Sequence, residues 1–442
     1  MRKLIKNGKV FDGQSDSLKN ADILINGKYI EDVGKFDLSE KDIDIIDASN
    51  CIVSPGFIDI HAHLREPGYE YKETIATGTS AAAKGGFTTI CAMPTTIPIL
   101  DSQDSLEYLK ELCNDKSIIK VLPISAVTIG REGKEIVEMQ SLVDAGAIGF
   151  SDDGEPVSDD YIMKMSLEYS KMVGRPIMNH CDDRGINYKA KGVMNEGFLA
   201  QRLGCEGIPN AAEASMLSRD ILLTELTGGN YHACHISASQ SLDVLKNARE
   251  RGVPFTAEVT PHHLTLTEEY ILGSSENDRN QIGKNAYNTN AKVFPPLRTQ
   301  SDIRSMINGI KDDLITIIAT DHAPHGFEDK MTTISQADFG ISNFETALGS
   351  VLEIVHSNEI ELVKLLKCMT SNPASFLKEK TGRIEKNYPA DITIFDSNKK
   401  WTVESDKFIS KGKNTPIEGK ELTGKVITTI VDGEIVYSCF GE

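Results

Sequence analysis

Short apolar runs alternate with longer amphipathic segments through the middle of the chain. We predict eight strands from these runs: Gly56–Ile60, Thr88–Ala92, Lys120–Ser125, Ala147–Ser151, Pro176–Asn179, Tyr231–Cys234, Pro254–Val259 and Ile315–Thr320. Helical periodicity lies between most of them, for example in Ser102–Cys113, Ser158–Val173, Ala211–Thr227 and Ser239–Arg251. Strands that alternate with helices are typical of parallel βα units, and eight such units predict an α/β fold of the (β/α)8 TIM-barrel type.

The two ends of the chain have a different pattern. Residues 1–54 alternate over short runs and carry Asn-Gly and Asp-Gly turn signals, and similar alternation returns at Ala390–Phe395. Neither end has enough apolar surface to fold well alone. We therefore predict that residues 1–54 and 383–442 form one composite β-sandwich domain beside a catalytic barrel of residues 55–382.

One segment interrupts the alternation of strands and helices. Gly273–Asn290 is polar, rich in Ser, Asn, Asp and Gly, and shows little periodicity. Loops of that length are usually functional or disordered. The pattern thus indicates either a lid or a disordered segment.

Composition narrows the classes of function. Lys and Arg total 47 against 65 for Asp and Glu, which gives a formal net charge of −18. Such an acidic chain binds nucleic acids and anionic membranes poorly, so we expect no nucleic-acid partner and no membrane partner. The first residues lack an apolar signal core, and no apolar run reaches the length of a membrane span. The eight Cys form no C-x-x-C pair, which favours a reducing, cytoplasmic location.

Residues able to bind a metal follow several of the predicted strands. They are His61 and His63 after the first strand, Asp152 and Asp153 after the fourth, His180 after the fifth, His235 after the sixth, and Asp321 and His322 after the eighth. Each alone is a weak signal, because an Asp at a strand end more often caps a helix. Together they are strong, because a barrel brings the carboxyl ends of its strands to one face.

The number of these side chains indicates a particular chemistry. Four imidazoles and two carboxylates can hold two zinc ions if one carboxylate bridges them. Two such ions can share a hydroxide and make it nucleophilic near neutral pH. A remaining carboxylate can then carry a proton to a leaving nitrogen. The pattern predicts metal-assisted hydrolysis of a C–N bond.

Longer motifs surround the same residues. They are HAHLREPG (His61–Gly68), YKETIATGT (Tyr71–Thr79), GGFTTICAMP (Gly85–Pro94), GFSDDG (Gly149–Gly154), NHCDD (Asn179–Asp183), CHIS (Cys234–Ser237), EVTPHHL (Glu258–Leu264), KVFPPLR (Lys292–Arg298), TDHAPH (Thr320–His325) and FETA (Phe344–Ala347). Over about residues 50–395 the chain resembles the amidohydrolase superfamily and, more narrowly, the dihydroorotases of the bacterial class I type.

The resemblance implies two Zn²⁺ ions per chain. The implied ligands are His61, His63 and Asp321 for one ion, His180 and His235 for the other, and Asp153 as the bridge. Asp321 is also implied as the catalytic general base and then the general acid. In this class an aspartate can bridge where relatives use a carboxylated lysine.

The resemblance also implies substrate contacts. Arg65 and His325 match positions that hold the substrate carboxylate, and Asn290 matches a residue that contacts the pyrimidine ring. Two positions depart from the family pattern. Thr95 stands where the family has an Asn that helps to bind the carboxylate, and Phe294 replaces the family's Asn before Pro-Pro-Leu-Arg.

The implied function is a zinc-dependent dihydroorotase, which interconverts N-carbamoyl-L-aspartate and L-dihydroorotate in pyrimidine (UMP) biosynthesis. One alternative is another cyclic amidase, such as a dihydropyrimidinase, hydantoinase or allantoinase. These typically have a Lys at the end of the fourth strand, and Ala147–Gly154 contains none. The other is a non-enzymatic dihydroorotase-like scaffold for a transcarbamoylase, although such relatives have lost metal ligands that this chain keeps. A homodimer and an association with aspartate transcarbamoylase are left open.

Other histidines and cysteines lie close to these positions in the sequence. We interpret His262 and His263, after the seventh strand, as structural or lid-anchoring residues, because six ligands already complete the site. Cys181 and Cys234 each neighbour a ligand histidine. We interpret both as buried thiols rather than metal ligands.

Overall fold

The computed structural model describes residues 2–37, 43–187, 191–273, 282–283 and 285–439. Its centre is a sheet of eight parallel strands in the order β8-β9-β10-β11-β12-β15-β16-β17. The strands are β8 (Phe57–Ala62), β9 (Phe87–Ala92), β10 (Lys120–Ser125), β11 (Gly149–Phe150), β12 (Ile177–Asn179), β15 (Tyr231–Ala233), β16 (Thr256–Val259) and β17 (Ile317–Ile318). A parallel bridge between Ala62 and His322 joins the two edges of the sheet. The predicted (β/α)8 barrel is confirmed.

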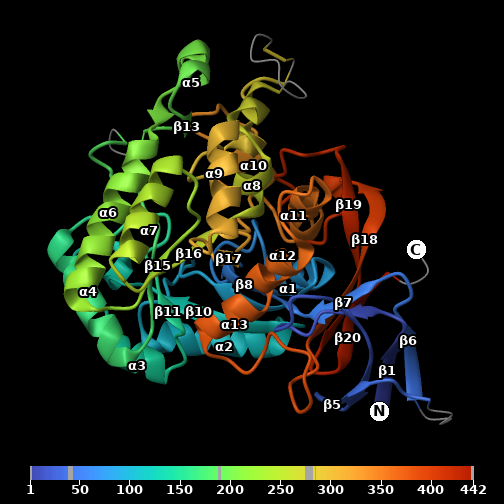
Figure 1. The fold of residues 1–442 in the computed structure, drawn as a ribbon. Helices are drawn as coiled ribbons and strands as arrows, with labels where there is room; N and C mark the ends of the chain where they lie inside the picture. The colour runs from blue at the N-terminus through green and yellow to red at the C-terminus, as the bar shows by residue number, and fades with distance from the viewer. Residues whose placement is uncertain (1, 38–42, 188–190, 274–281, 284, 440–442) are drawn as a thin grey trace.

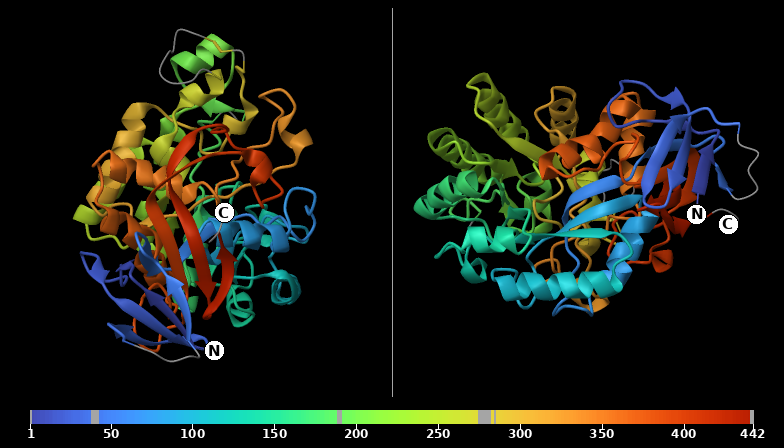
Figure 2. Two further views of the ribbon diagram at one scale, coloured as in Figure 1. Left: turned by 90° about the vertical axis from the view of Figure 1, so that its right-hand side faces the viewer. Right: turned by 90° about the horizontal axis from the view of Figure 1, so that it is seen from below.

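Helices surround this barrel on the outside (Figures 1 and 2). They are α1 (Ile75–Lys84), α2 (Gln103–Lys116), α3 (Met139–Asp144), α4 (Asp160–Val173), α6 (Asn210–Thr227), α7 (Ser239–Glu250), α9 (Gln300–Lys311), α11 (Ala347–His356), α12 (Leu362–Met369) and α13 (Ser371–Leu377). Local sequence fixes their ends. The Asp159 carboxylate caps the first turn of α4, and Gly174 ends that helix in a left-handed conformation at φ 69°.

Smaller elements lie in the loops that connect strands and helices. They are η1 (Ile129–Arg131), β13 (Met194–Asn195), α5 (Phe198–Leu203), β14 (Gly207–Ile208), α8 (Pro261–Thr265), η3 (Glu268–Leu272), η4 (Thr289–Ala291), α10 (Phe327–Lys330) and η5 (Ser405–Lys407). The predicted lid or disordered segment, Gly273–Asn290, includes residues 274–281 and 284, which lie outside the described residues. Within the described part of the segment, the amide of Gly283 donates to the carbonyl of Leu272 at 3.0 Å.

Both ends of the chain build the second domain. One sheet has the order β5-β4-β1-β6, and the other has the order β20-β19-β18-β7-β2-β3. The strands are β1 (Arg2–Lys6), β2 (Lys9–Val10), β3 (Lys19–Asn20), β4 (Asp22–Asn26), β5 (Tyr29–Gly34), β6 (Ile43–Asp47), β7 (Ile52–Pro55), β18 (Ile392–Thr402), β19 (Glu421–Val431) and β20 (Glu434–Ser438). β7 pairs antiparallel with β18, and both sheets contribute to one apolar core. The predicted β domain from both chain ends is confirmed, whereas its boundaries at 54/55 and 382/383 stay a prediction.

The two parts of the molecule are closely joined. The long strands β18 and β19 extend beyond the N-terminal sheet, as the red and blue ribbons of Figure 2 (left) show. β19 also packs against α11. Gly56 alone separates β7 of the end domain from β8 of the barrel. A Cβ atom at Gly56 would lie 2.1 Å from the Thr88 hydroxyl oxygen, so only glycine fits this junction. The first barrel strand is therefore anchored at its start by the end domain.

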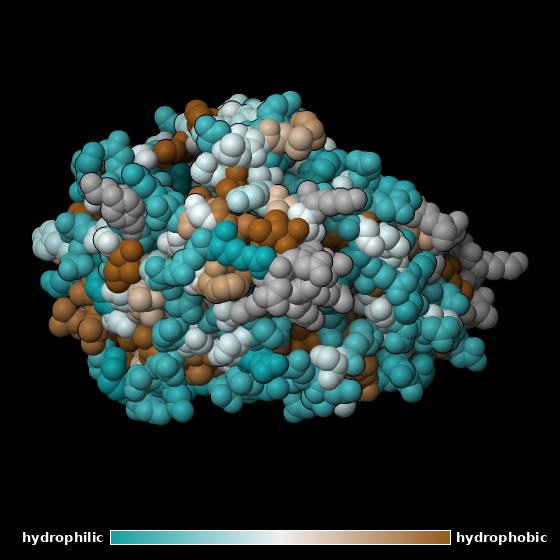
Figure 3. Space-filling view, turned by 90° about the horizontal axis from the view of Figure 1, so that it is seen from above, coloured by the Kyte–Doolittle hydropathy of each residue, from teal (hydrophilic) through white to brown (hydrophobic). Residues whose placement is uncertain are grey.

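The molecular surface offers few large apolar areas in the view of Figure 3. On the atoms drawn in colour, hydrophilic residues dominate and hydrophobic residues form small separate groups. Within the described ranges, no helix combines the length and apolar character that a bilayer span requires.

Candidate active site

The two histidines of the first barrel strand are held in the same way. His61 lies near the end of β8, and His63 follows it. His61 Nδ1 is 2.6 Å from Glu258 Oε1, and His63 Nδ1 is 2.7 Å from Thr95 Oγ1. The Glu258 carboxylate can only accept, so it requires a proton on His61 Nδ1, whereas the Thr95 hydroxyl can donate to His63 Nδ1 or accept from it. His63 Nε2 in turn lies 3.1 Å from Asp321 Oδ1, to which it donates a hydrogen bond in this structure.

Both Nε2 atoms point at the same two carboxylates. His61 Nε2 is 3.3 Å from Asp153 Oδ1, and His63 Nε2 is 3.4 Å from Asp153 Oδ2. Asp321 Oδ1 lies 3.1 Å from His63 Nε2 and 3.8 Å from His61 Nε2. The ends of the first, fourth and eighth barrel strands therefore meet at one point, as the sequence predicted.

Two further histidines reach Asp153 from the other side. His180 Nδ1 and His235 Nε2 lie 3.7 and 3.4 Å from Asp153 Oδ1. The two ring nitrogens are 3.0 Å from each other. Asp153 thus sits between a pair of histidines from β8 and a pair that follows β12 and β15, which is the position that a bridging ligand needs.

This cluster fits a metal centre. All six predicted ligands are buried, and His61 Nε2 has no hydrogen-bond partner in the described structure. The ligand atoms of His61, His63 and Asp321 all lie within 4.8 Å of one another, as do those of His61, Asp153 and His235. Buried groups that could carry charge are costly unless they are paired or bind a cation. Imidazole nitrogens and carboxylate oxygens are donors that zinc accepts.

The carboxylates of the cluster are ionised at neutral pH. Burial by itself raises the pKa of Asp321, but the hydrogen bond from His63 and the charge of His61 lower it to about 2. The pKa of Asp153 is well below its usual range. There too burial raises it, and the charge of His61 with hydrogen bonds from the surrounding histidines outweighs that cost. Both groups are therefore available as anionic ligands.

The backbone is strained at three site residues. Arg65, His235 and Asp321 have φ values of 62°, 30° and 45°, in the left-handed region that side chains other than glycine rarely adopt. Such strain costs about 1–3 kcal/mol for each residue and gathers at functional sites. The surrounding fold must therefore hold these three residues in place.

A cavity of about 410 Å³ opens beside the cluster. Asp153, His180 and Asp321 form part of its wall, and Arg65 and Lys72 form another part. Its size suits a small ligand. The cavity therefore places cationic side chains next to the candidate metal ligands.

Arg65 and His325, the two residues predicted to hold the substrate carboxylate, also have partners within the protein. His325 Nε2 is 2.8 Å from the Phe339 carbonyl and must donate to it, while Lys72 Nζ lies 3.2 Å from His325 Nδ1. Lys72 also donates to Asp338 Oδ2 at 2.6 Å. Both nitrogens of His325 are therefore engaged within the protein. Arg65, 3.3 Å from His325 Nε2, is the stronger candidate for a carboxylate contact.

The remaining predicted substrate residues have different positions. Thr95 lines the cavity, but its hydroxyl is bonded to His63. Asn290 lies in η4 and is not among the cavity-lining residues, so its contact with a substrate ring stays a prediction. Phe294 does line the cavity, and its ring centre is 4.4 Å from that of His180. An aromatic face thus covers one candidate ligand.

Neighbouring histidines and cysteines have partners of their own. Asn343 Nδ2 donates to His262 Nδ1 at 2.7 Å, and His263 Nε2 donates to the Pro295 carbonyl at 3.1 Å. Cys234 lies close to His61, but burial raises the pKa of its thiol well above the usual range. A protonated thiol is a poor metal ligand. These contacts support the structural interpretation of His262 and His263.

Glu258 is a site residue to which the sequence assigned no role. It lies on β16, fully buried, and contacts both His61 and His232. A carboxylate inside an otherwise apolar strand was the signal that could have identified it. Arg131 was also missed: it lines the cavity, and it donates to the backbone carbonyl of Asp153.

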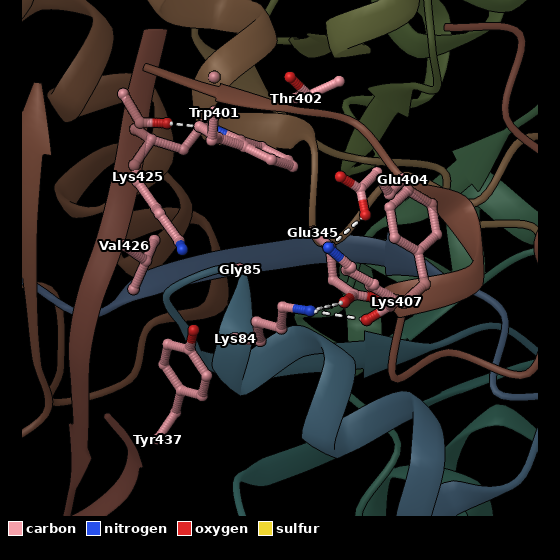
Figure 4. Close-up of a pocket in the computed structure, with 14 residues that line it drawn as sticks. Lys84, Gly85, Glu345, Trp401, Thr402, Glu404, Lys407, Lys425, Val426 and Tyr437 are labelled. Carbon is pink, nitrogen blue, oxygen red and sulfur yellow. Dashed lines mark hydrogen bonds and ion pairs between the residues drawn. The ribbon is translucent and has the colours of Figure 1, made fainter. Parts of the chain in front are cut away.

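A second cavity, of about 440 Å³, lies between the barrel and strands β18 and β19 (Figure 4). Lys84 Nζ lies 2.8 Å from Glu345 Oε1, and Lys407 pairs with Glu404. The Trp401 indole donates to a backbone carbonyl at 2.9 Å. The metal-capable groups found among the described residues include no side chain of this cavity. The cavity beside the histidine cluster is therefore the candidate active site.

Comparisons with known proteins agree with this geometry. Residues 50–241 match the dihydro-orotase-like family model, and residues 291–437 match the amidohydrolase family model. The dihydroorotase of Caldanaerobacter subterraneus is 45% identical over 99% of this chain and 97% of its own length. That of Thermoanaerobacter sp. is 44% identical over the same shares of both chains. The chain belongs to the dihydroorotase family.

The family assignment settles the class of reaction. Like its dihydroorotase relatives, the chain is a hydrolase that acts on cyclic amides. The L-hydantoinase of Arthrobacter aurescens has the same fold, with a TM-score of 0.86 over 99% of this chain and 96% of its own. It is only 23% identical, so that likeness concerns the fold. Within the dihydroorotase family, the histidine and aspartate cluster described above is a candidate metal centre.

Proposed function

We propose that this chain interconverts L-dihydroorotate and N-carbamoyl-L-aspartate, a step of pyrimidine biosynthesis. One observation carries the proposal: Arg65, Lys72 and Arg131 line the same cavity as Asp321 and the histidine cluster. Glu155 and Asp338 also line the cavity and Lys72 is paired with Asp338, so in a chain of net charge −18 Arg65 and Arg131 are the local cations of this wall that can attract an anionic substrate. The printed names of the relatives support the same substrate.

We infer that the cluster holds two zinc ions. The proposed ligands are His61, His63 and Asp321 for one ion, His180 and His235 for the other, and Asp153 for both. When bound, such ions polarise a carbonyl group and lower the pKa of water. The distances from Asp153 to histidines on both sides support its assignment as the bridge.

Asp321 is the proposed proton carrier. It lines the cavity, and its carboxylate is ionised at neutral pH because its pKa is about 2. In hydrolysis it accepts a proton from the attacking water and delivers it to the ring nitrogen as the C–N bond breaks. In ring closure the same carboxylate carries the proton in the opposite direction.

The cationic wall orients the substrate for this transfer. Arg65 binds the substrate carboxylate with its planar guanidinium, which can donate two parallel hydrogen bonds. The backbone carbonyl of Pro324 helps to hold Arg65 in place, since it accepts a hydrogen bond from Arg65 Nε at 3.1 Å. A substrate held in this way would present its amide to Asp321.

A substrate comparison tests the proposal. The zinc-loaded protein is offered dihydroorotate, dihydrouracil, hydantoin and allantoin under identical conditions. We expect the highest kcat/KM for dihydroorotate, because it is the one compound of the four that carries a carboxylate for Arg65 to bind. A preference for dihydrouracil, hydantoin or allantoin would indicate the cyclic-amidase alternative. Full metal loading without activity on any compound would indicate a scaffold.

A further inference from the structure

A single carboxylate touches both halves of the candidate metal centre. Glu258 Oε1 accepts a hydrogen bond from His61 Nδ1 at 2.6 Å and another from the backbone amide of His235 at 3.2 Å. His61 belongs to the first proposed ligand set and His235 to the second. Glu258 lies on β16, which contributes no proposed ligand of its own.

The other oxygen of this carboxylate is also occupied. His232 Nε2 lies 3.1 Å from Glu258 Oε2, and His232 Nδ1 lies 2.8 Å from Thr256 Oγ1. Glu258 and His232 are both fully buried. In the neutral tautomer with its proton on Nε2, His232 donates to Glu258 and accepts from Thr256. This arrangement fixes the carboxylate plane, and it gives both oxygens of Glu258 and both ring nitrogens of His232 a partner.

The contact with His235 concerns its backbone rather than its ring. His235 has a φ of 30°, a left-handed conformation that is costly for a residue with a side chain. Its ring reaches Asp153 from this strained turn, with Nε2 at 3.4 Å from Oδ1. A hydrogen bond from the His235 amide to a buried carboxylate stabilises the turn, and so determines where the ring points.

We propose that Glu258 is a positioning residue shared by the two metal sites. It sets the His61 tautomer, so that Nε2 faces Asp153, and it holds the turn that directs the His235 ring to the same carboxylate. This inference rests on the proposed metal centre. Acceptors that orient metal-binding histidines from outside the coordination sphere commonly change metal affinity by about 10- to 100-fold.

Metal release distinguishes this role from a merely structural one. Zinc loss to a chelator is followed for the wild type and for Glu258→Gln, which keeps the size of the side chain but removes its charge. We expect both ions to leave about 10- to 100-fold faster from the variant. In contrast, Thr95→Val removes the acceptor of His63 alone and should accelerate the release of one ion.

A matched control separates this effect from the loss of any buried carboxylate. Glu213 is buried and accepts hydrogen bonds from Ser237, Ala238 and Ser241, none of which is a proposed ligand. Glu213→Gln should therefore retain both ions as the wild type does. If Glu258→Gln does not fold, His232→Gln replaces it, and we expect the same two-ion effect with a smaller magnitude.

A second measurement follows the Nδ1 proton of His61 in the zinc-loaded protein. NMR of labelled histidine should show this proton in a strong hydrogen bond to the Glu258 carboxylate, and Glu258→Gln should move its resonance upfield and speed its exchange with water. Release rates equal to those of the wild type for both ions would overturn the proposal, and acceleration of one ion alone would remove the role at His235. A wild type that holds no metal would overturn the metal centre itself and this inference with it.

Discussion

Thr95 Oγ1 lies 2.7 Å from His63 Nδ1, so the residue that replaces the family's asparagine holds a candidate metal ligand. The hydroxyl contacts His63 Nδ1 at the same ring position at which the Glu258 carboxylate contacts His61. A hydroxyl is a weaker acceptor than a carboxylate and can also donate, so Thr95 accepts from His63 Nδ1 only when His63 Nε2 gives up its proton to bind a metal ion. The departure from the family pattern thus has a structural consequence that the sequence did not indicate.

This relationship predicts an ordered effect of three substitutions. Thr95→Val keeps the shape but removes the acceptor, so the ion held by His63 should bind about 10- to 100-fold more weakly. Thr95→Ser keeps the hydroxyl and serves as the control. Thr95→Asn offers an acceptor to His63 and N–H donors to the cavity, so its activity should equal or exceed that of the wild type. Chelator competition and kcat/KM check the series, and unchanged zinc affinity in Thr95→Val would contradict it.

Asp153→Ala should lose at least one metal ion per chain. Asp153 is the only predicted ligand with distances of 3.3–3.7 Å to histidines on both sides of the cluster. Elemental analysis of the purified variant measures the effect directly. Asp159→Asn, a substitution at the exposed cap of α4, provides the control from the same loop. Full metal retention in Asp153→Ala would remove the bridging assignment.

Asp321→Asn should bind substrate but turn it over slowly. An amide cannot accept and return the proton, and a positioned acid–base group is commonly worth about a hundredfold to ten-thousandfold in rate. Because Asp321 is also a proposed ligand, zinc content must be measured on the same sample. A variant with full zinc and a near-normal kcat would exclude the proton-carrier role.

Arg65→Ala should impair one substrate selectively. Loss of one partner from a desolvated ion pair costs about 2–5 kcal/mol, which corresponds to roughly 30-fold to several thousandfold in kcat/KM for dihydroorotate. Any residual activity on dihydrouracil should barely change, because that compound lacks the carboxylate. Arg65→Lys keeps the charge without the planar fork and should give an intermediate value. Equal losses on both substrates would indicate a structural role for Arg65 instead.

The eight barrel strands could be predicted because strands buried on both faces appear as continuous apolar runs. Their lengths could not. Ala147 and Ile148 are buried but precede β11, and Ile315 is buried but precedes β17. Apolar character reports burial, whereas a strand begins and ends with its ladder of hydrogen bonds. The four long helices predicted between strands were found within a few residues of their expected ends.

The candidate ligands could be predicted because each lies at the end of a strand or after it, and a barrel brings strand ends together. The residues that orient them could not be predicted in this way. Glu258 is 197 positions from His61 in sequence, and their contact depends on how the barrel closes. Lys72 reaches His325 across 253 positions. Motifs mark the ligands, while three-dimensional packing selects the side chains that support them.

The depressed pKa of His325 should make the free energy of unfolding depend on pH. Its pKa is lowered from 6.5 to about 3, first because burial disfavours the charged ring and then because Arg65, Lys330 and Lys72 are positive; a hydrogen bond with Asp338 opposes the shift only in part. In the unfolded chain the same imidazole has its ordinary pKa. Between pH 6.5 and about 3, the unfolded state therefore binds a proton that the folded state does not. Acid shifts the equilibrium toward unfolding, so this contribution to stability is present above pH 6.5 and is lost as the pH falls.

The expected size follows from the linkage of about 1.4 kcal/mol per pH unit. Between about pH 6 and pH 4, the metal-free wild type should lose about 2–3 kcal/mol more of its free energy of unfolding than His325→Gln loses. Glutamine can still donate to the Phe339 carbonyl but cannot be protonated in this range. Urea unfolding at several pH values checks the difference, with both proteins also carrying Asp338→Asn because Asp338 Oδ2 lies 3.3 Å from His325 Nδ1 and would otherwise titrate differently in the two. Parallel curves over the whole range would show that His325 is not held neutral by its surroundings.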